Sequence, residues 1–323
     1  MIRVLATAAA LSLPLTGLVS GVQAQDADRF KDVVIETETA GAGVEVLYGA
    51  GGNLALAYGT GANGEAEAFL VDDQFAPLTD RIMAKVQEIA GTDVKFLVNT
   101  HWHFDHSGGN ENFGKAGAVI VAHDNVRQRM AKDGTAGGRE VKASPPIALP
   151  TLTFRDRQTI NSAGMTIRAI HVHHAHTDGD ALVHFVEPNV IHMGDTFFSR
   201  TTNSFPFIDT NSGGSIQGAI TAAETGLKLA DAETAIIPGH GKLTNRAELA
   251  EYRDMLVDIR DRVQVLIDSG EDRDAVIAAK PAEAYAAARA EGFIDADRFV
   301  GTVYDGLTNF GAHTHENGER HVR

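Results

Sequence analysis

The feature that most constrains the fold is the stretch Thr100–Asn110, which reads THWHFDHSGGN. It places histidine at positions 101, 103 and 106 and aspartate at position 105. The apolar run Val94 to Val98 comes directly before it and predicts a buried strand that ends in a loop. Side chains on a strand repeat every two residues, so a His-x-His pair at its end directs both imidazoles to the same side. Because imidazole nitrogen and carboxylate oxygen both suit zinc, and the two glycines permit a tight turn, this loop is expected to face two metal ions.

The order His-x-His-x-Asp-His followed by small residues resembles the motif of the metallo-β-lactamase superfamily. Three later segments match the family in order, each after a predicted strand and each with the expected glycine: AHTDGD at 175–180, VIHMGD at 190–195 and IIPGHG at 236–241. The resemblance covers about residues 44–243. It implies an α/β fold, a four-layer αβ/βα sandwich of two sheets with helices outside.

The resemblance also implies a set of metal ligands and one supporting acid. His101, His103 and His176 would hold one zinc ion, Asp105, His106 and His240 the second, and Asp195 would bridge the two. His174 is an alternative to His176, but the Thr-Asp-Gly that follows His176 favours the latter. Asp72, at the end of a predicted strand, corresponds to a buried acid that supports the metal loop from behind.

Two zinc ions about 3.5–4 Å apart lower the pKa of a shared water from about 15.7 toward about 7. The resemblance therefore implies a hydrolase that attacks a carbonyl with a metal-bridging hydroxide, which Asp105 can orient and whose proton it can pass on. The scissile bond is expected in a β-lactam, amide, ester or thioester, and a glyoxalase-II-like thioesterase or a lactonase is the alternative. A zinc-binding module without turnover would fit the 14 histidines, and a di-iron site that oxidises sulfur or oxygen species is a third interpretation.

One departure bears on the substrate. Some zinc β-lactamases carry a lysine three residues after the second-zinc ligand that matches Asp195, and this lysine grips the substrate carboxylate. Phe198 stands at that position here. Arg200 and Asn211 are the candidates to take over the substrate contact.

The beginning of the chain has the pattern of a secretory leader. A short basic start, an apolar run broken by Pro14 and Gly17, and Val22-Gln23-Ala24 before Gln25 predict a signal peptide over 1–24. The mature protein is then expected in the periplasm or outside the cell, without a membrane anchor. Further boundaries are an N-terminal arm at 25–40, the catalytic domain at 41–244, a C-terminal helical extension at 245–309 and a polar tail at 310–323.

Composition limits the partners. The chain has no cysteine, so neither a disulfide nor a thiolate ligand is available. Its formal net charge of −15 argues against nucleic acid and leaves a small molecule as the expected partner. The sequence leaves the oligomeric state open.

Hydrophobic periodicity predicts the elements around the motifs. A helix opened by Pro77-Leu78-Thr79 is expected to run to about Ala90 and to end at Gly91, and further helices are expected at 124–132, 214–230 and 245–269. The polar stretch 133–146 is expected to be a substrate lid or a solvated linker. Predicted strands lie at 44–48, 54–58, 68–71, 94–98, 118–122, 151–154, 165–172, 181–185, 190–193 and 235–237.

Overall fold

The computed structural model describes residues 29–136, 138–289 and 291–313. The chain divides into two units, Met1–Asp32 and Val33–Arg323, and every element discussed below belongs to the second. The predicted signal peptide and the last ten residues of the predicted tail lie outside the described residues.

The first sheet has seven strands in the order β1-β2-β3-β4-β5-β6-β9. The strands from β1 to β4 are joined antiparallel, and those from β4 to β9 are parallel. Parallel pairing requires crossovers, and α2 (Thr79–Ala90) provides the one between β4 and β5. The strands are β1 (Glu36–Gly41), β2 (Val44–Tyr48), β3 (Leu54–Thr60), β4 (Ala66–Val71), β5 (Val94–Val98), β6 (Val119–His123) and β9 (Leu152–Phe154).

The second sheet has six strands in the order β10-β11-β12-β13-β14-β15. Its pairs are antiparallel except for β13 and β14, which run parallel because α6 (Ile216–Leu229) lies between them in the chain. The strands are β10 (Arg157–Ser162), β11 (Met165–His171), β12 (Ala181–Phe185), β13 (Val190–His192), β14 (Ala235–Ile237) and β15 (Thr244–Asn245).

The two sheets pack face to face around one apolar core. Val46 and Val98 of the first sheet meet Val183 and Val190 of the second in this cluster. The rings of Phe69 and Phe185 touch edge to face across the interface, with centroids 6.3 Å apart. Burial of these side chains removes apolar area from water at about 25 cal/mol per Å², which is the main force that holds the sheets together.

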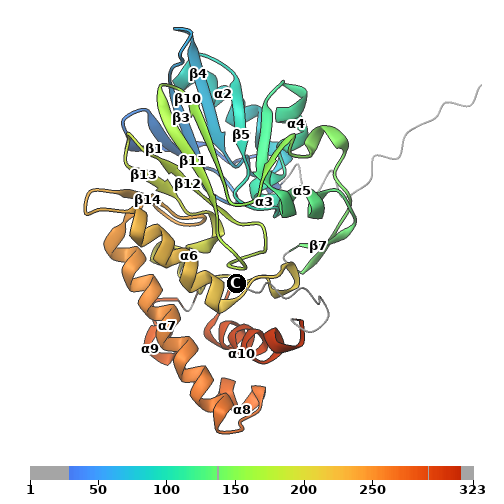
Figure 1. Ribbon diagram of the computed structural model, residues 1–323, viewed down its shortest axis with the longest axis vertical. Helices are drawn as coiled ribbons and strands as arrows, with labels where there is room; N and C mark the ends of the chain where they lie inside the picture. Colours follow the sequence, from blue (N-terminus) through green and yellow to red (C-terminus); the bar gives the residue numbers. More distant parts are fainter. Residues whose placement is uncertain (1–28, 137, 290, 314–323) are drawn as a thin grey trace, which may run out of the picture. The chain divides into compact units, whose positions relative to one another are not determined.

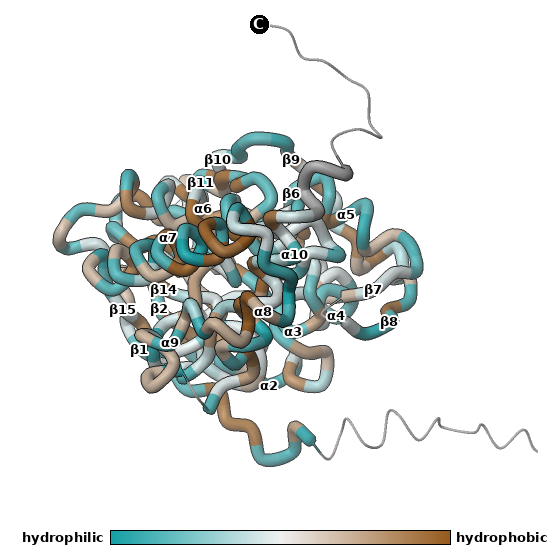
Figure 2. The backbone as a smooth tube through the Cα atoms, turned by 90° about the horizontal axis from the view of Figure 1, so that it is seen from below, coloured by the Kyte–Doolittle hydropathy of each residue, from teal (hydrophilic) through white to brown (hydrophobic). Residues whose placement is uncertain are grey.

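Helices cover the outer faces of both sheets, as Figure 1 shows. On the first sheet α2 contacts β3 and β4 and ends at Gly91, whose φ of 66° is the left-handed conformation that glycine adopts most easily. On the second sheet α6 packs beside α7 (Arg246–Asp268), and Figure 2 shows hydrophobic stretches of both helices side by side. The predicted four-layer αβ/βα sandwich is confirmed.

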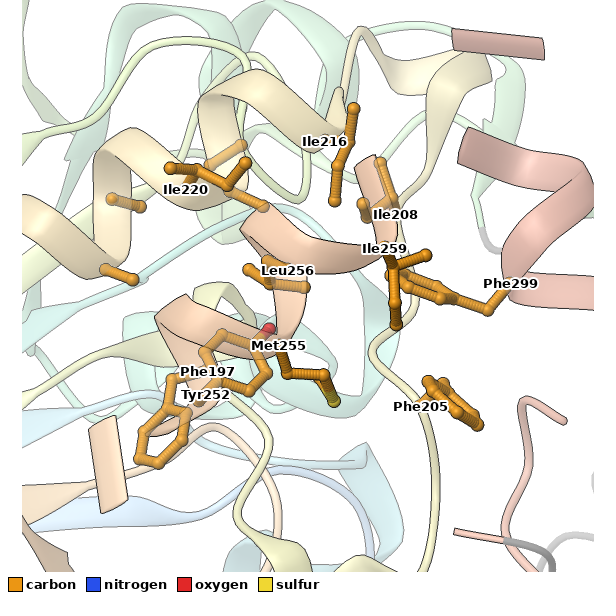
Figure 3. Packing of buried hydrophobic residues seen from close by; sticks show 14 of the residues in the cluster. Phe197, Phe205, Ile208, Ile216, Ile220, Tyr252, Met255, Leu256, Ile259 and Phe299 are labelled. Atoms are coloured by element: carbon orange, nitrogen blue, oxygen red, sulfur yellow. The ribbon is translucent and has the colours of Figure 1, made fainter. Parts of the chain in front are cut away.

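The helices after β15 pack on α6 and on the loop that follows β13. Tyr252, Met255 and Leu256 of α7 lie in one cluster with Ile216 and Ile220 of α6, as Figure 3 shows. The remaining helices are α8 (Arg273–Ala278), α9 (Glu283–Ala286) and α10 (Ala296–His313). Among the described residues, none of the helices combines the length and the apolar character needed to cross a bilayer.

Three strands of the main sheets were not predicted from the sequence: β1, β10 and the two-residue β15, which lies where the predicted helix 245–269 begins. The polar segment predicted as an arm ends in β1, an edge strand whose alternating Glu and Thr side chains are exposed and therefore show no hydrophobic pattern. The strand β10 was missed for the same reason, because its outward side chains are polar as well.

Two further segments differ from their predicted form. The stretch 133–146 contains a hairpin of β7 (Gly134–Ala136) and β8 (Arg139–Val141). The helix α10 extends to His313, beyond residue 309 where the helical extension was predicted to end. The first residues of the predicted tail are therefore helical.

Candidate metal centre

The predicted ligands come from loops that follow several different strands. His101 and His103 follow β5, and the single-turn helix α3 (Phe104–Ser107) carries Asp105 and His106. The remaining predicted ligands are His176 before β12, Asp195 after β13 and His240 after β14. The two sheets thus supply ligands to one common edge of the sandwich.

These seven residues form two adjoining clusters. The first contains His101, His103, His176 and Asp195, all buried, and the second contains the partly exposed Asp105 and His240 with the buried His106. Within each cluster, one candidate ligand atom per residue lies within 4.8 Å of all the others. Both clusters match the sets predicted from the sequence.

The carboxylate of Asp195 lies between the two clusters. Its Oδ2 is 3.5 Å from Nε2 of His176 and 3.9 Å from Nε2 of His101. Its Oδ1 is 2.9 Å from Nε2 of His106 and 3.4 Å from Nε2 of His240. One oxygen therefore faces each cluster, which is the arrangement expected of a bridging ligand.

Hydrogen bonds fix which nitrogen of each ring points into the site. Nδ1 of His106 donates to Oδ2 of Asp72 at 2.7 Å, and Nδ1 of His176 donates to the carbonyl oxygen of Phe207 at 2.7 Å. Nε2 of His103 lies 2.9 Å from Oδ2 of Asp209. With the proton held on the outer nitrogen, the inner nitrogen keeps its lone pair and is ready to bind a cation.

The donor set fits metal ions. Nδ1 of His103 and Nε2 of His176 face each other at 2.9 Å, and two lone pairs at that distance repel unless a cation or proton lies between them. Nε2 of His101 and Oδ1 of Asp195 are buried without a well-directed hydrogen bond among the described residues. Buried polar atoms are rarely left unsatisfied, so these atoms point to an ion as their partner.

Electrostatics agree with neutral imidazoles in the first cluster. Burial lowers the pKa of His176 to about 4, and burial together with the neighbouring His106 lowers the pKa of His101. Burial acts to raise the pKa of Asp105, but His106 and His240 outweigh it and hold that pKa at about 2. The first cluster thus offers unprotonated histidines near neutral pH. In the second cluster burial acts to lower the histidine pKa values, but the neighbouring carboxylates outweigh it, raising the pKa of His106 and raising that of His240 to about 9, so a metal ion would have to displace those protons.

Asp72 occupies the supporting place predicted for it. Its backbone is left-handed, with φ of 59°, and its buried carboxylate accepts hydrogen bonds from the backbone N–H and the hydroxyl of Thr100, both at 2.7 Å. The same carboxylate receives Nδ1 of His106. Asp72 therefore ties the end of β5 to α3 and orients a predicted ligand.

The structure distinguishes between the two adjacent histidines. His176 enters the first cluster, whereas His174 is exposed and its Nδ1 lies 2.9 Å from the carbonyl oxygen of Gly213. His171 stacks on His123 with ring centroids 3.7 Å apart, outside both clusters. The sequence preference for His176 agrees with this geometry.

The predicted substrate contacts are placed differently. The guanidinium of Arg200 pairs with Glu248 and Glu251 on α7, so its charge is already neutralised. Asn211 is exposed in the short helical turn Thr210–Ser212. Phe198 stacks on His240 with ring centroids 5.1 Å apart. An aromatic ring therefore occupies the position where some zinc β-lactamases carry a lysine.

Two positioning groups were missed by sequence reasoning. Burial acts to raise the pKa of Asp209, but hydrogen bonds from His103 and from the hydroxyl of Ser212 outweigh it and lower that pKa. Asp180 accepts bonds from the backbone N–H groups of His176 and Thr177. Asp180 stands in the AHTDGD motif that was recognised, whereas Asp209 is marked only by its place after an apolar run.

The comparison with family models decides the relationship. Residues 59–253 match the model of the metallo-beta-lactamase superfamily. The chain belongs to this superfamily. Among curated proteins, a hydroxyacylglutathione hydrolase of a Polaromonas species is 26% identical over 192 residues, which is 58% of this chain and 62% of that protein. The chain thus spans less than two thirds of the length of this relative.

Solved structures with low sequence identity share the fold. A metallo-beta-lactamase from Pontibacter korlensis superposes with a TM-score of 0.53 and 16% identity, over 69% of this chain and 99% of the other. The sec-alkylsulfatase Pisa1 from a Pseudomonas species superposes with a TM-score of 0.61 and 12% identity, over 88% of this chain and 52% of the other. The alkylsulfatase therefore matches a larger part of this chain than the β-lactamase does.

Proposed function

We propose that this protein is a hydrolase that holds two zinc ions and cleaves an ester or thioester. The observation that carries the proposal is the position of Asp195, which directs one carboxylate oxygen to each of two ligand clusters. Bound zinc would supply a Lewis acid that polarises a carbonyl and makes water acidic enough to lose a proton near neutral pH. The curated relative named above supports a thioester as the substrate class.

Different residues would hold the ions, accept the proton and position the imidazole rings. His101, His103 and His176 would hold one ion, and Asp105, His106 and His240 the other. Asp105 is partly exposed and its Oδ2 lies 3.3 Å from Nε2 of His240, so this carboxylate can orient an attacking water and accept its proton at the open side of the site. Asp72 and Asp209 keep the rings of His106 and His103 in place.

β-Lactams rank behind esters and thioesters for a structural reason. Phe198 stands where some zinc β-lactamases carry the lysine that grips the substrate carboxylate, and Arg200 is paired with Glu248 and Glu251. A zinc-binding module without turnover is the non-enzymatic alternative. We also propose that residues 1–24 direct the protein to the periplasm or out of the cell.

Metal analysis and hydrolysis together test the proposal. The purified protein should hold two zinc ions per chain, and Asp195→Asn should lower that content because both clusters lose a ligand. A chromogenic β-lactam, a thioester and a lactone should be assayed in parallel, with thioester turnover expected. Two bound ions without turnover of any of the three would support the zinc-binding module, and a single ion would contradict the bridging role.

A further inference from the structure

A segment of the C-terminal extension is anchored beside the first ligand cluster. Ile294 donates its backbone N–H to the hydroxyl of Ser204 at 2.9 Å, and its carbonyl oxygen accepts the backbone N–H of Phe205 at 3.0 Å. The rings of Phe205 and Phe299 stack with centroids 5.2 Å apart, as Figure 3 shows. The beginning of α10 therefore has a fixed position against the loop that leads to Asp209.

Phe207, on that same loop, contacts both this segment and two predicted ligands. Its ring lies 6.1 Å from the ring of His103 and 5.6 Å from the ring of His176, and its carbonyl oxygen orients the latter. The guanidinium of Arg298 lies 5.7 Å from the centre of the same ring. One aromatic ring therefore neighbours both this arginine and two predicted metal ligands.

The charge of Arg298 is held in place but not neutralised. Its guanidinium also lies over the exposed ring of Phe293 at 4.8 Å, so two aromatic faces restrain it. The carboxylate of Asp295 accepts the backbone N–H of Arg298, and the side chain of Arg298 makes no ion pair within residues 29–136, 138–289 and 291–313. Asp297 is the other acid on this turn. An exposed, restrained and unpaired arginine is available to an anion.

We propose that Arg298 binds an anionic group of the substrate, a carboxylate or a sulfonate, with Phe207 and Phe293 packing against the apolar part beside it. This inference rests on the proposed hydrolase function and names the substrate feature that the site selects. A planar guanidinium suits an oxyanion because it can donate two parallel hydrogen bonds. The role predicted for Arg200 passes to Arg298, since Arg200 is held by Glu248 and Glu251.

The test compares two thioesters that differ only in charge: S-benzoyl-3-mercaptopropionate and its uncharged carboxamide. Arg298→Gln should raise the KM of the carboxylate substrate by about tenfold to a hundredfold, the loss expected for a charged hydrogen bond. The kcat of both substrates and the KM of the carboxamide should stay unchanged. The KM of the carboxylate should rise with salt in the wild type and much less in the variant. Arg298→Lys should recover part of the loss, and Arg200→Gln is the matched control without effect.

Equal changes for both substrates, or no change, would overturn the inference. If the zinc-loaded wild type cleaves neither thioester, the proposed function fails separately, and calorimetric binding of the carboxylate thioester then decides the role of Arg298. Binding by the wild type that Arg298→Gln abolishes supports the anion site. Binding that the variant leaves intact, or no binding by the wild type, overturns it.

Discussion

At the scale of single residues, the centre depends on atoms that approach each other closely. Asp195 faces both ligand clusters, and the backbone beside it leaves no space for an added side chain. A Cβ at Gly239 would overlap Oδ1 of Asp195, and a Cβ at Gly52 would overlap the imidazole of His106. Glycine is required at these two positions because the backbone packs directly against two predicted ligands.

Gly239→Ala should therefore displace Asp195 and lower the metal content. The added methyl group also meets the backbone of Gly194 at 2.6 Å, so a small shift of the carboxylate alone would not relieve the overlap. We expect loss of at least one of two zinc ions, measured by elemental analysis after dialysis. Unchanged zinc content would show that Asp195 does not hold the two ions together.

Asp105→Asn should lower kcat by about a hundredfold or more, because general-base catalysis contributes roughly that much. The amide keeps the shape of the side chain but accepts no proton. Thioester hydrolysis and zinc content should be measured together, since a lost ion would also reduce the rate. Asp261→Asn on α7, whose exposed carboxylate pairs with the Arg260 side chain, is the matched control. A fully active Asp105→Asn protein would exclude the proposed role.

At the scale of elements, the ends of strands from the two sheets meet through histidines outside the metal centre. His123 ends β6 and His171 ends β11, and their rings stack nearly parallel, with an interplanar angle of 11°. Burial lowers the pKa of His171 to about 4, with a smaller contribution from His123 in the same direction. This contact is therefore made between neutral rings.

His171→Phe should make the metal-free protein less sensitive to acid. Between about pH 4 and pH 6.5, His171 is protonated in the unfolded chain but neutral in the folded protein. The free energy of unfolding therefore falls as pH falls through this window. Phenylalanine can keep the stack without titrating. The slope of stability against pH should decrease by less than about 1.4 kcal/mol per pH unit, the limit for one proton. Urea unfolding at several pH values measures it, and an unchanged slope would contradict the prediction.

Gly306→Ala tests the helix α10 by itself. Nothing lies within 4 Å of a Cβ at this position, and the residue is inside the helix. Alanine should therefore raise the free energy of unfolding by about 0.5–1 kcal/mol, the usual helical preference over glycine. A decrease in stability would mean that α10 packs more tightly there than its surroundings indicate.

Sequence patterns predicted the elements that have a buried face or a defined end. Apolar runs such as Val94–Val98 and the glycine after α2 located strand and helix within a residue or two. The strands β1 and β10 were not predicted, because their outward side chains are polar and lie on an exposed edge or face. The two ligand clusters were predictable because fixed motifs carry their residues. The contacts of Asp209 with His103 and of Arg298 with Phe207 arise from packing between distant segments, which no local pattern records.

At the scale of the whole molecule, the centre joins the two sheets in a chain without cysteine. The first cluster combines His101 after β5 of one sheet with Asp195 after β13 of the other. Bound ions would therefore stabilise the packing between the sheets as well as serve chemistry, because ligands held only by the folded chain stabilise it by mass action.

Removal of metal should lower the stability of the whole protein. At a free zinc concentration about a thousand times the dissociation constant, binding to the folded state contributes about 4 kcal/mol. A chelator should lower the melting temperature by several degrees, and added zinc should restore it. A reducing agent is the control and should have no effect, because the chain has no cysteine to form a disulfide. An unaltered melting temperature after complete zinc removal would show that the sheets hold together without the ions.

The separation of the ligands along the chain also has a consequence for timing. His106 faces His240, its neighbour in space, across 134 positions of sequence. At a synthesis rate on the order of 10 residues per second, roughly ten seconds pass between the synthesis of the THWHFDH segment and that of His240. The nascent chain thus presents only half of the centre, and a complete pocket for two ions arises after translation has passed β14.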